Sequence, residues 1–265
     1  MPLNTQKVIT HIVNWLSDYA NNSNVKGFVI GISGGIDSAV TSTLAAKTGL
    51  PVICVEMPIH QDKTQEQRGL NHISFLRSNF PNFSSVQADL TPVFDGFTVS
   101  LPLNKGTELE KLALANTRSR LRMAALFYIA QINKSLVLGT GNKIEDFGIG
   151  FFTKYGDGGV DISPIADLTK TEVYEIGKQL NIIKEILIAP PTDGLFGDGR
   201  TDEDQIGASY PELEWAMKTT EENNFNPKDF TEREAKVFEI YTRLNRINQH
   251  KMNPISICKI PKELK

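Results

Sequence analysis

Residues 26–43 read KGFVIGISGGIDSAVTST, and this stretch decides the fold. The apolar run from Gly27 to Ile32 predicts a strand, Ser33-Gly34-Gly35 predicts a tight loop, and the helix formers and small residues after Asp37-Ser38 predict a helix. Two adjacent glycines allow positive φ and let several backbone N–H groups converge in front of the helix N-terminus. We therefore expect this loop to bind a phosphate.

The loop is not a Walker A loop, because no Gly-Lys-Ser/Thr follows it and no lysine occurs between Lys26 and Lys47. Asp37 beside a phosphate site would repel the phosphates unless a cation lay between them. The sequence therefore predicts magnesium as a cofactor. The alternative interpretation is an ordinary glycine-rich turn between a strand and a helix.

The pattern Ser-Gly-Gly-x-Asp-Ser after a strand resembles the PP-loop of the N-type ATP pyrophosphatases. This resemblance implies an adenine-nucleotide alpha-hydrolase-like fold in which residues 31–38 hold the β,γ-pyrophosphate of ATP. The α-phosphate is then attacked, and AMP and pyrophosphate are released. The motif indicates a superfamily and leaves the second substrate open.

Size and composition narrow the class of protein. With 265 residues, of which 40% are hydrophobic, the chain is long enough for a large core, and we expect residues 1–265 to form a single domain. A formal charge of −3 argues against nucleic acid as a partner. No apolar run approaches ~20 residues, and we see no signal sequence and no disulfide scaffold, so we expect a cytoplasmic protein without a membrane partner.

The rest of the chain alternates predicted strands and helices. Further apolar runs predict strands at residues 51–57, 84–90 and 135–140, and helical patterns fall at residues 3–20, 62–80 and 105–132. This order predicts an α/β fold with a doubly wound, mostly parallel sheet and helices on both faces. Ligands of such sheets bind at the carboxyl ends of the strands, so Asp37 and Glu145 could share one metal there.

Two further segments carry functional signals. Residues 141–159 read GNKIEDFGIGFFTKYGDGG, with six glycines, and we interpret this loop as a mobile lid, the alternative being a disordered insertion. Arg118, Arg120 and Arg122 alternate within an otherwise apolar helix, so they cannot share one face. A buried arginine there would need a phosphate or carboxylate partner. Capping boxes starting at Thr169, Ser209 and Thr231 predict three later helices.

Gly139-Thr140, Glu145, the run GFFTKYGDGG and the later LTK resemble the ammonia-dependent bacterial NAD synthetases, and the resemblance extends from the first helix to His250-Lys251. It implies a homodimer that couples ammonia to deamido-NAD using ATP and magnesium, giving NAD, AMP and pyrophosphate. It also implies that a C-terminal tail, about residues 249–265, contacts the substrate.

The same resemblance assigns site residues. The implied ATP contacts are Gly31, Ile32, Ser33, Gly34, Gly35, Ile36, Asp37, Ser38, Thr140, Lys170 and Thr192. The implied deamido-NAD contacts are Arg120, Lys154, Asp161, His250 and Lys251, and the implied metal ligands are Asp37 and Glu145. We expect Asp37, Lys154, Lys170 and Asp161 to be catalytic: the lysines offset charge on the phosphates, and Asp161 takes a proton from ammonium.

Two features depart from the family pattern. Many bacterial members have Gly-Thr-Asp-His where this chain has Gly139-Thr140-Gly141-Asn142, so contacts from those Asp and His side chains cannot be assumed. No segment matches the N-terminal glutaminase domain of the glutamine-dependent relatives. Free ammonia, or a separate donor protein, is therefore the expected nitrogen source.

Three alternatives from other classes remain. A ligase like the ATP pyrophosphatase part of GMP synthetase would share the PP-loop but lacks FFTKYGDGG. A tRNA-modifying enzyme would need a basic surface and often catalytic cysteines, whereas this chain has two cysteines and a net negative charge. A non-catalytic nucleotide sensor would not need Asp37 and Glu145.

Overall fold

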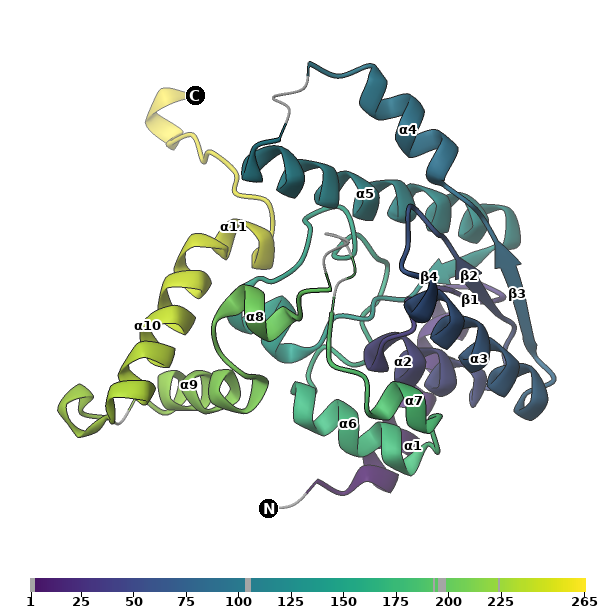
Figure 1. The fold of residues 1–265 in the computed structure, drawn as a ribbon, viewed down its shortest axis with the longest axis horizontal. Coiled ribbons are helices and arrows are strands. Elements are labelled where there is room, and N and C mark those ends of the chain that lie inside the picture. The colour runs from purple at the N-terminus through teal and green to yellow at the C-terminus, as the bar shows by residue number, and fades with distance from the viewer. Residues whose placement is uncertain (1–2, 103–105, 193, 195–198, 224) are drawn as a thin grey trace.

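The computed structural model describes residues 3–265 apart from 103–105, 193, 195–198 and 224. Within the described residues, four parallel strands form one sheet in the order β3-β2-β1-β4 (Figure 1). The strands are β1 (Gly27–Gly31), β2 (Val52–Glu56), β3 (Phe83–Gln87) and β4 (Ser135–Val137). The predicted α/β fold with a doubly wound parallel sheet is confirmed.

The central strand β1 fixes the position of the site. Its residue Val29 pairs with Ile53 of β2 on one side and with Val137 of β4 on the other. The chain runs outward from β1 to β2 and β3, and then returns to β4 on the opposite side of β1. At such a reversal a crevice opens at the carboxyl ends of the two strands, between β1 and β4 in this sheet.

One face of the sheet is covered by four helices, whose side chains form the larger hydrophobic core. They are α1 (Thr5–Asn22), α2 (Ile36–Ala46), α3 (Lys63–Asn79) and α6 (Lys170–Gln179). Of the residues in α2, all of which are described, Asp37 alone is not buried. The helix formers and small residues of α2 therefore pack in the interior, while its one carboxylate lies in the first turn, at the sheet edge.

The other face is covered by α5 (Glu108–Asn133), which follows α4 (Thr91–Val99) (Figure 1). The sequence predicted α5 within a few residues but did not predict α4, a nine-residue helix that has only Phe94 buried. In α5 the residues Ala115, Ser119 and Ala130 are buried. The predicted apolar surface is partly exposed, since Leu109, Leu112, Tyr128 and Ile132 are among the exposed large side chains.

A second, smaller core lies beside the sheet domain, on the left of Figure 1. It is built by α9 (Tyr210–Glu222), α10 (Glu232–Ile247) and the π-helix η1 (Lys143–Ile149), with α8 (Asp202–Ile206) at its edge. The three predicted capping boxes are present, at the starts of α6, α9 and α10. Short elements complete the described chain: α7 (Lys184–Leu187), η2 (Pro227–Asp229), α11 (Gln249–Met252) and η3 (Lys262–Leu264).

The segment expected to be a loop, residues 141–159, is helical in its first half. Asn142 caps η1 by accepting a hydrogen bond from the Glu145 N–H at 3.1 Å, and Gly150 ends it in a left-handed conformation. Ile144 and Ile149 are buried in the smaller core, which explains why this glycine-rich stretch forms a helix. The interpretation as a continuous loop is therefore corrected, and its mobility stays a prediction.

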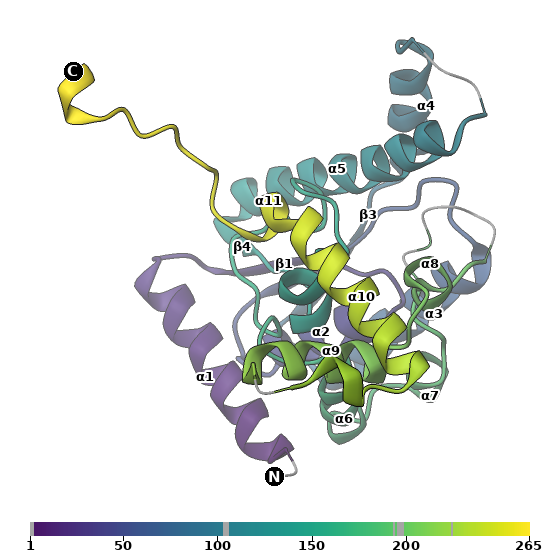
Figure 2. The same ribbon diagram turned by 90° about the vertical axis from the view of Figure 1, so that its left-hand side faces the viewer.

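The C-terminal tail leaves the body after α11 and extends away from it (Figure 2). Ile255, Ile257 and Ile260 are exposed there. Within the described part of the chain, no helix is both long and apolar enough to cross a membrane.

Candidate active site

A cavity of about 640 Å³ opens at the carboxyl ends of β1 and β4. All residues from Gly31 to Ser38 line it, together with Thr140, Lys170 and Thr192, which lie on three other segments. The structure therefore brings together every residue that the sequence assigned to ATP. The cavity lies at the reversal of the strand order, as expected for a ligand site of a doubly wound sheet.

The PP-loop is held in shape by its own polar groups. The Gly35 N–H donates to Ser33 Oγ at 3.2 Å, and the Ser38 hydroxyl donates to the Gly35 carbonyl at 3.1 Å. Gly34 has φ +78°, and a Cβ there would lie 2.5 Å from the carbonyl oxygen of Gln65 on α3. A side chain at this position would strain the backbone and collide with α3, so the turn requires glycine. The loop leads directly into the N-terminus of α2, a favourable position for an anion.

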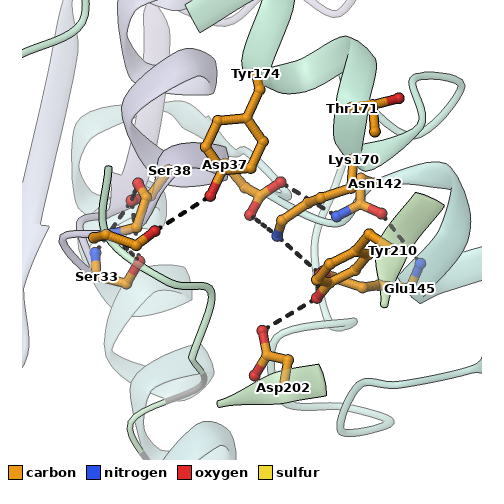
Figure 3. A network of polar contacts seen from close by, with 12 residues as sticks. Ser33, Asp37, Ser38, Asn142, Glu145, Lys170, Thr171, Tyr174, Asp202 and Tyr210 are labelled. Carbon is orange, nitrogen blue, oxygen red and sulfur yellow. Dashed lines mark hydrogen bonds and ion pairs between the residues drawn. The ribbon is translucent and has the colours of Figure 1, made fainter. Parts of the chain in front are cut away.

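Three charged side chains from three elements meet beside this loop (Figure 3). Lys170, the first residue of α6, donates from Nζ to Asp37 Oδ2 at 2.6 Å and to Glu145 Oε1 at 2.9 Å. The Lys170 side chain is only 4% exposed. Asn142 Nδ2 also donates to Asp37 Oδ1, at 3.2 Å. The predicted meeting of Asp37 and Glu145 is therefore observed, and Lys170 lies between them.

Burial and the charge of the ion-pair partner shift the pKa values of these groups in opposite directions. Burial would lower the pKa of Lys170, but Asp37 and Glu145 raise it well above its usual value, so its ammonium stays charged. For Glu145, burial favours the neutral acid, but Lys170 and the hydrogen bond from Tyr210 hold the pKa below its usual value. For Asp37, burial raises the pKa despite the attraction of Lys170.

A tyrosine that sequence reasoning missed completes this network. The Tyr210 hydroxyl, from the start of α9, donates to Glu145 Oε1 at 2.5 Å and lies 3.1 Å from Asp202 Oδ2 (Figure 3). Lys170 Nζ lies 4.8 Å from the centroid of the Tyr210 ring. Nothing in the sequence distinguishes Tyr210 from a core aromatic, because its partner Glu145 is 65 positions away.

Several carboxylates that were not predicted as site residues also line the cavity, among them Asp157 and Asp146. Asp157, within the motif GDG, accepts hydrogen bonds from the Ser119 hydroxyl at 2.6 Å and the Thr153 N–H at 3.0 Å. The Asp146 carboxylate occupies the space that a side chain at Gly141 would fill. Burial, reinforced by neighbouring carboxylates, raises the pKa of Asp146 to about 8. The departure from the family pattern at Gly141 thus makes room for Asp146.

The donor set at the PP-loop fits magnesium carried by a nucleotide. Among the described residues, no group of three or more His, Cys, Asp or Glu side chains is placed to hold a metal ion. Magnesium usually binds proteins through one or two carboxylates and completes its ligands with phosphates and water. Asp37 and Glu145 both contact one ammonium and line the cavity, so they are the residues that would hold it.

The basic residues assigned to deamido-NAD are only partly brought to the cavity. Lys251 lines it, but its Nζ donates to the carbonyls of Gly150 and Phe152, at 2.8 and 2.9 Å. Arg120, Lys154 and His250 are not among its described lining residues. Lys154 links the other two instead: Arg120 Nε lies 3.4 Å from the Lys154 carbonyl, and Lys154 Nζ donates to the His250 carbonyl.

Asp161 and the other two arginines lie elsewhere. Asp161 is outside the described cavity lining, and its Oδ2 accepts a hydrogen bond from the Val137 N–H at 2.8 Å, which fastens it to the end of β4. Arg118 stacks over Phe94, and Arg122 donates to the Met57 carbonyl and to Gln61. The arginines therefore diverge as predicted, and Arg118 also lies close enough to Asp95 for their charges to interact.

The NAD synthase family model matches residues 8–254. This chain belongs to the NAD synthase family. It is 35% identical to the NH(3)-dependent NAD(+) synthetase of Carboxydothermus hydrogenoformans, over 95% of this chain and 96% of the relative. It is 37% identical to that of Alkaliphilus oremlandii, again over 95% of this chain and 96% of the relative. The predicted family is confirmed.

Solved structures show the same fold. NMN synthetase from Francisella tularensis superposes with a TM-score of 0.83 at 33% identity, covering 98% of this chain and 100% of that chain. The NH3-dependent NAD synthetase of Campylobacter jejuni superposes with a TM-score of 0.78, covering 97% of this chain and 100% of that chain; at 24% identity it supports the fold alone.

Proposed function

We propose that this protein is an ATP-dependent, AMP-forming ligase that joins ammonia to the nicotinate carboxylate of deamido-NAD. The observation that carries this proposal is the contact of Asp37, Lys170 and Glu145 beside the PP-loop, in a member of the NAD synthase family. The relatives named above as NH(3)-dependent NAD(+) synthetases support the choice of ammonia and of the amide product.

The first half of the proposed reaction activates the carboxylate. A nicotinate oxygen attacks the α-phosphorus of ATP, a new O–P bond forms, and the bond to the β-phosphate breaks, so that pyrophosphate leaves. The PP-loop N–H groups and the buried ammonium of Lys170 are suited to stabilise charge on the leaving pyrophosphate. Magnesium held by Asp37 and Glu145 would add a further positive charge at the same phosphates.

The second half forms the amide. Ammonia attacks the acyl carbon, the bond to AMP breaks, and the nitrogen loses a proton. The sequence assigned this proton to Asp161, whose carboxylate accepts from Val137 outside the described cavity lining. Asp157 and Asp146 line the cavity and are better placed to accept it. Asp157 has the more fixed geometry, because Ser119 and Thr153 both donate to one of its oxygens.

A second candidate substrate is nicotinate mononucleotide, with NMN as product. The NMN synthetase of Francisella tularensis is 33% identical to this chain over nearly the whole length of both proteins. In addition, the ammonium groups of Lys154 and Lys251, expected to bind the dinucleotide, donate to backbone carbonyls of this chain. A mononucleotide carries fewer phosphates and needs fewer such cations.

Assembly and location complete the proposal. Four large apolar side chains of α5, Leu109, Leu112, Tyr128 and Ile132, are exposed in the single chain, which favours a homodimer that buries them. Cys54 and Cys258 are both free, which suits a reducing cytoplasm.

The experiment that tests the function uses the full chain with ATP, magnesium and ammonium, and either deamido-NAD or nicotinate mononucleotide. Amide formation with the dinucleotide at the higher kcat/KM supports the first candidate, and the reverse preference supports the second. Asp37→Asn serves as the inactive control. If neither acceptor is amidated while Asp37→Asn and wild type bind ATP equally, the proposal is wrong.

A further inference from the structure

Tyr210 holds a carboxylate that is expected to bind the metal. Its side chain is buried, with 3% of the residue exposed, and its hydroxyl has one hydrogen to donate. The nearer acceptor is Glu145 Oε1 at 2.5 Å, and this is also the oxygen that Lys170 Nζ contacts at 2.9 Å. Neither of these two donors uses Glu145 Oε2. The two contacts therefore fix the orientation of the carboxylate through one of its oxygens.

A second residue of α9 holds the other side of the network. Glu214 lies one helical turn after Tyr210, on the same face. It accepts hydrogen bonds from the Thr171 N–H at 2.9 Å and the Thr171 hydroxyl at 2.6 Å, directly after Lys170. One face of α9 thus contacts both Glu145 and the start of α6, while the Tyr210 ring lies against the Lys170 ammonium (Figure 3).

We propose that Tyr210 is a positioning residue for this ligase: its hydroxyl fixes Glu145 through Oε1, in the orientation in which this carboxylate would hold magnesium together with Asp37. The inference rests on the proposed function. Glu145 comes from a π-helix in a glycine-rich segment, so its side chain needs an external partner to keep one orientation. Tyr210 provides that partner from the buried start of α9. Loss of the hydroxyl leaves the ring in place and removes one of the two contacts that orient the carboxylate, so that Lys170 alone holds Oε1.

The test compares Tyr210→Phe with Tyr241→Phe. Tyr241 is also buried in the smaller core but does not line the cavity, so it controls for removal of a hydroxyl from this region. Manganese serves as the magnetic probe, and its affinity is measured by electron paramagnetic resonance in the presence of α,β-methylene-ATP, which cannot be cleaved. Because a hydrogen bond to a charged group contributes more free energy than a neutral one, manganese affinity and kcat should each fall roughly tenfold to hundredfold in Tyr210→Phe. The KM for the nicotinate nucleotide should stay within about twofold.

A double-mutant cycle with Glu145→Gln decides whether Tyr210 acts through Glu145. In the Glu145→Gln background, Tyr210→Phe should change manganese affinity by less than about twofold. Unchanged manganese affinity in Tyr210→Phe, or an equal loss in both backgrounds, would overturn the proposal. Melting curves confirm that each variant is folded before it is titrated. Because metal–nucleotide binding needs no acceptor substrate, this result stays interpretable even if the proposed nicotinate substrate is wrong.

Discussion

Replacing Lys170 by methionine removes the one ammonium that contacts both Asp37 and Glu145 in the described structure. The methionine side chain keeps similar length and apolar bulk, so the change acts mainly on charge. Two carboxylates that line the cavity would then face each other without their cation. The prediction is a large loss of stability in the absence of ligands, together with loss of activity.

The size of the expected loss of stability follows from the burial of these three side chains. The Lys170 side chain is 4% exposed, and those of Asp37 and Glu145 are 16% and 15% exposed, so solvent screens the contacts weakly. Removing one partner of a buried ion pair typically costs about 3–5 kcal/mol. For a chain of this size each kcal/mol lowers Tm by about 2–4 °C, so the expected decrease is roughly 6–20 °C. Turnover should fall by roughly a hundredfold or more, as when a group that stabilises transition-state charge is lost.

The assay is thermal unfolding by circular dichroism, with and without magnesium. Magnesium should raise the Tm of Lys170→Met more than that of wild type, because in the variant it no longer competes with the lysine for the carboxylates. Lys178→Met is the matched control, since Lys178 lies on the same helix but is exposed. A Lys170→Met protein that melts within about 2 °C of wild type would refute the argument, because the buried ion pairs of Lys170 would then make no substantial contribution to the free energy of unfolding.

Four further predictions concern other parts of the molecule. Asp146→Asn should raise stability more at pH 9 than at pH 5. The pKa of this carboxyl rises from 3.8 to about 8 on folding, so in wild type its ionisation makes the folded protein less stable as pH increases through that window. Tm values of variant and wild type at both pH values check the sign. Gly34→Ala should weaken ATP binding and lower Tm, because φ is +78° and the new Cβ meets the Gln65 carbonyl; calorimetry showing full ATP affinity would contradict this. Deleting residues 249–265 removes the Lys251 contacts to Gly150 and Phe152 and should weaken deamido-NAD more than ATP, and equal losses in titration calorimetry would indicate a purely structural tail. Sedimentation at micromolar concentration should show a dimer, and a monomer there would oppose the assembly inferred from α5.

The parts of the fold that local patterns encode were predictable from sequence. The strands and the long helices follow from apolar runs and from caps such as Thr169, whose effects act within a few residues. The PP-loop was predictable because Gly34 must adopt positive φ there. The π-helix was not, because it depends on burial of Ile144 and Ile149 against helices more than 60 positions away.

The site residues likewise fall into those that the sequence indicates and those whose roles depend on contacts between distant segments. Lys170 and Thr192 were assigned through the family resemblance, Lys170 within the motif LTK, and both line the cavity. Tyr210 and Asp146 were missed because their roles come from contacts with distant segments or from a space left by a neighbouring glycine. Asp161 was assigned by its place in a motif, but its carboxylate bonds to the backbone of β4, a partner that the motif does not encode. Motifs therefore indicate which residues to expect in the site, whereas a contact such as that of Tyr210 with Glu145 depends on how α9 packs against η1.

The central claim is that a nicotinate carboxylate attacks the α-phosphorus of ATP and is then displaced by ammonia. It is tested most directly with a nicotinate nucleotide labelled with ¹⁸O in that carboxylate, incubated with the protein, ATP, magnesium and ammonium. The account predicts AMP and amide in equal amounts, with one ¹⁸O from the carboxylate in the AMP phosphate and none in pyrophosphate, as read by mass spectrometry. ADP as the product, or AMP without the label while amide forms, would contradict it.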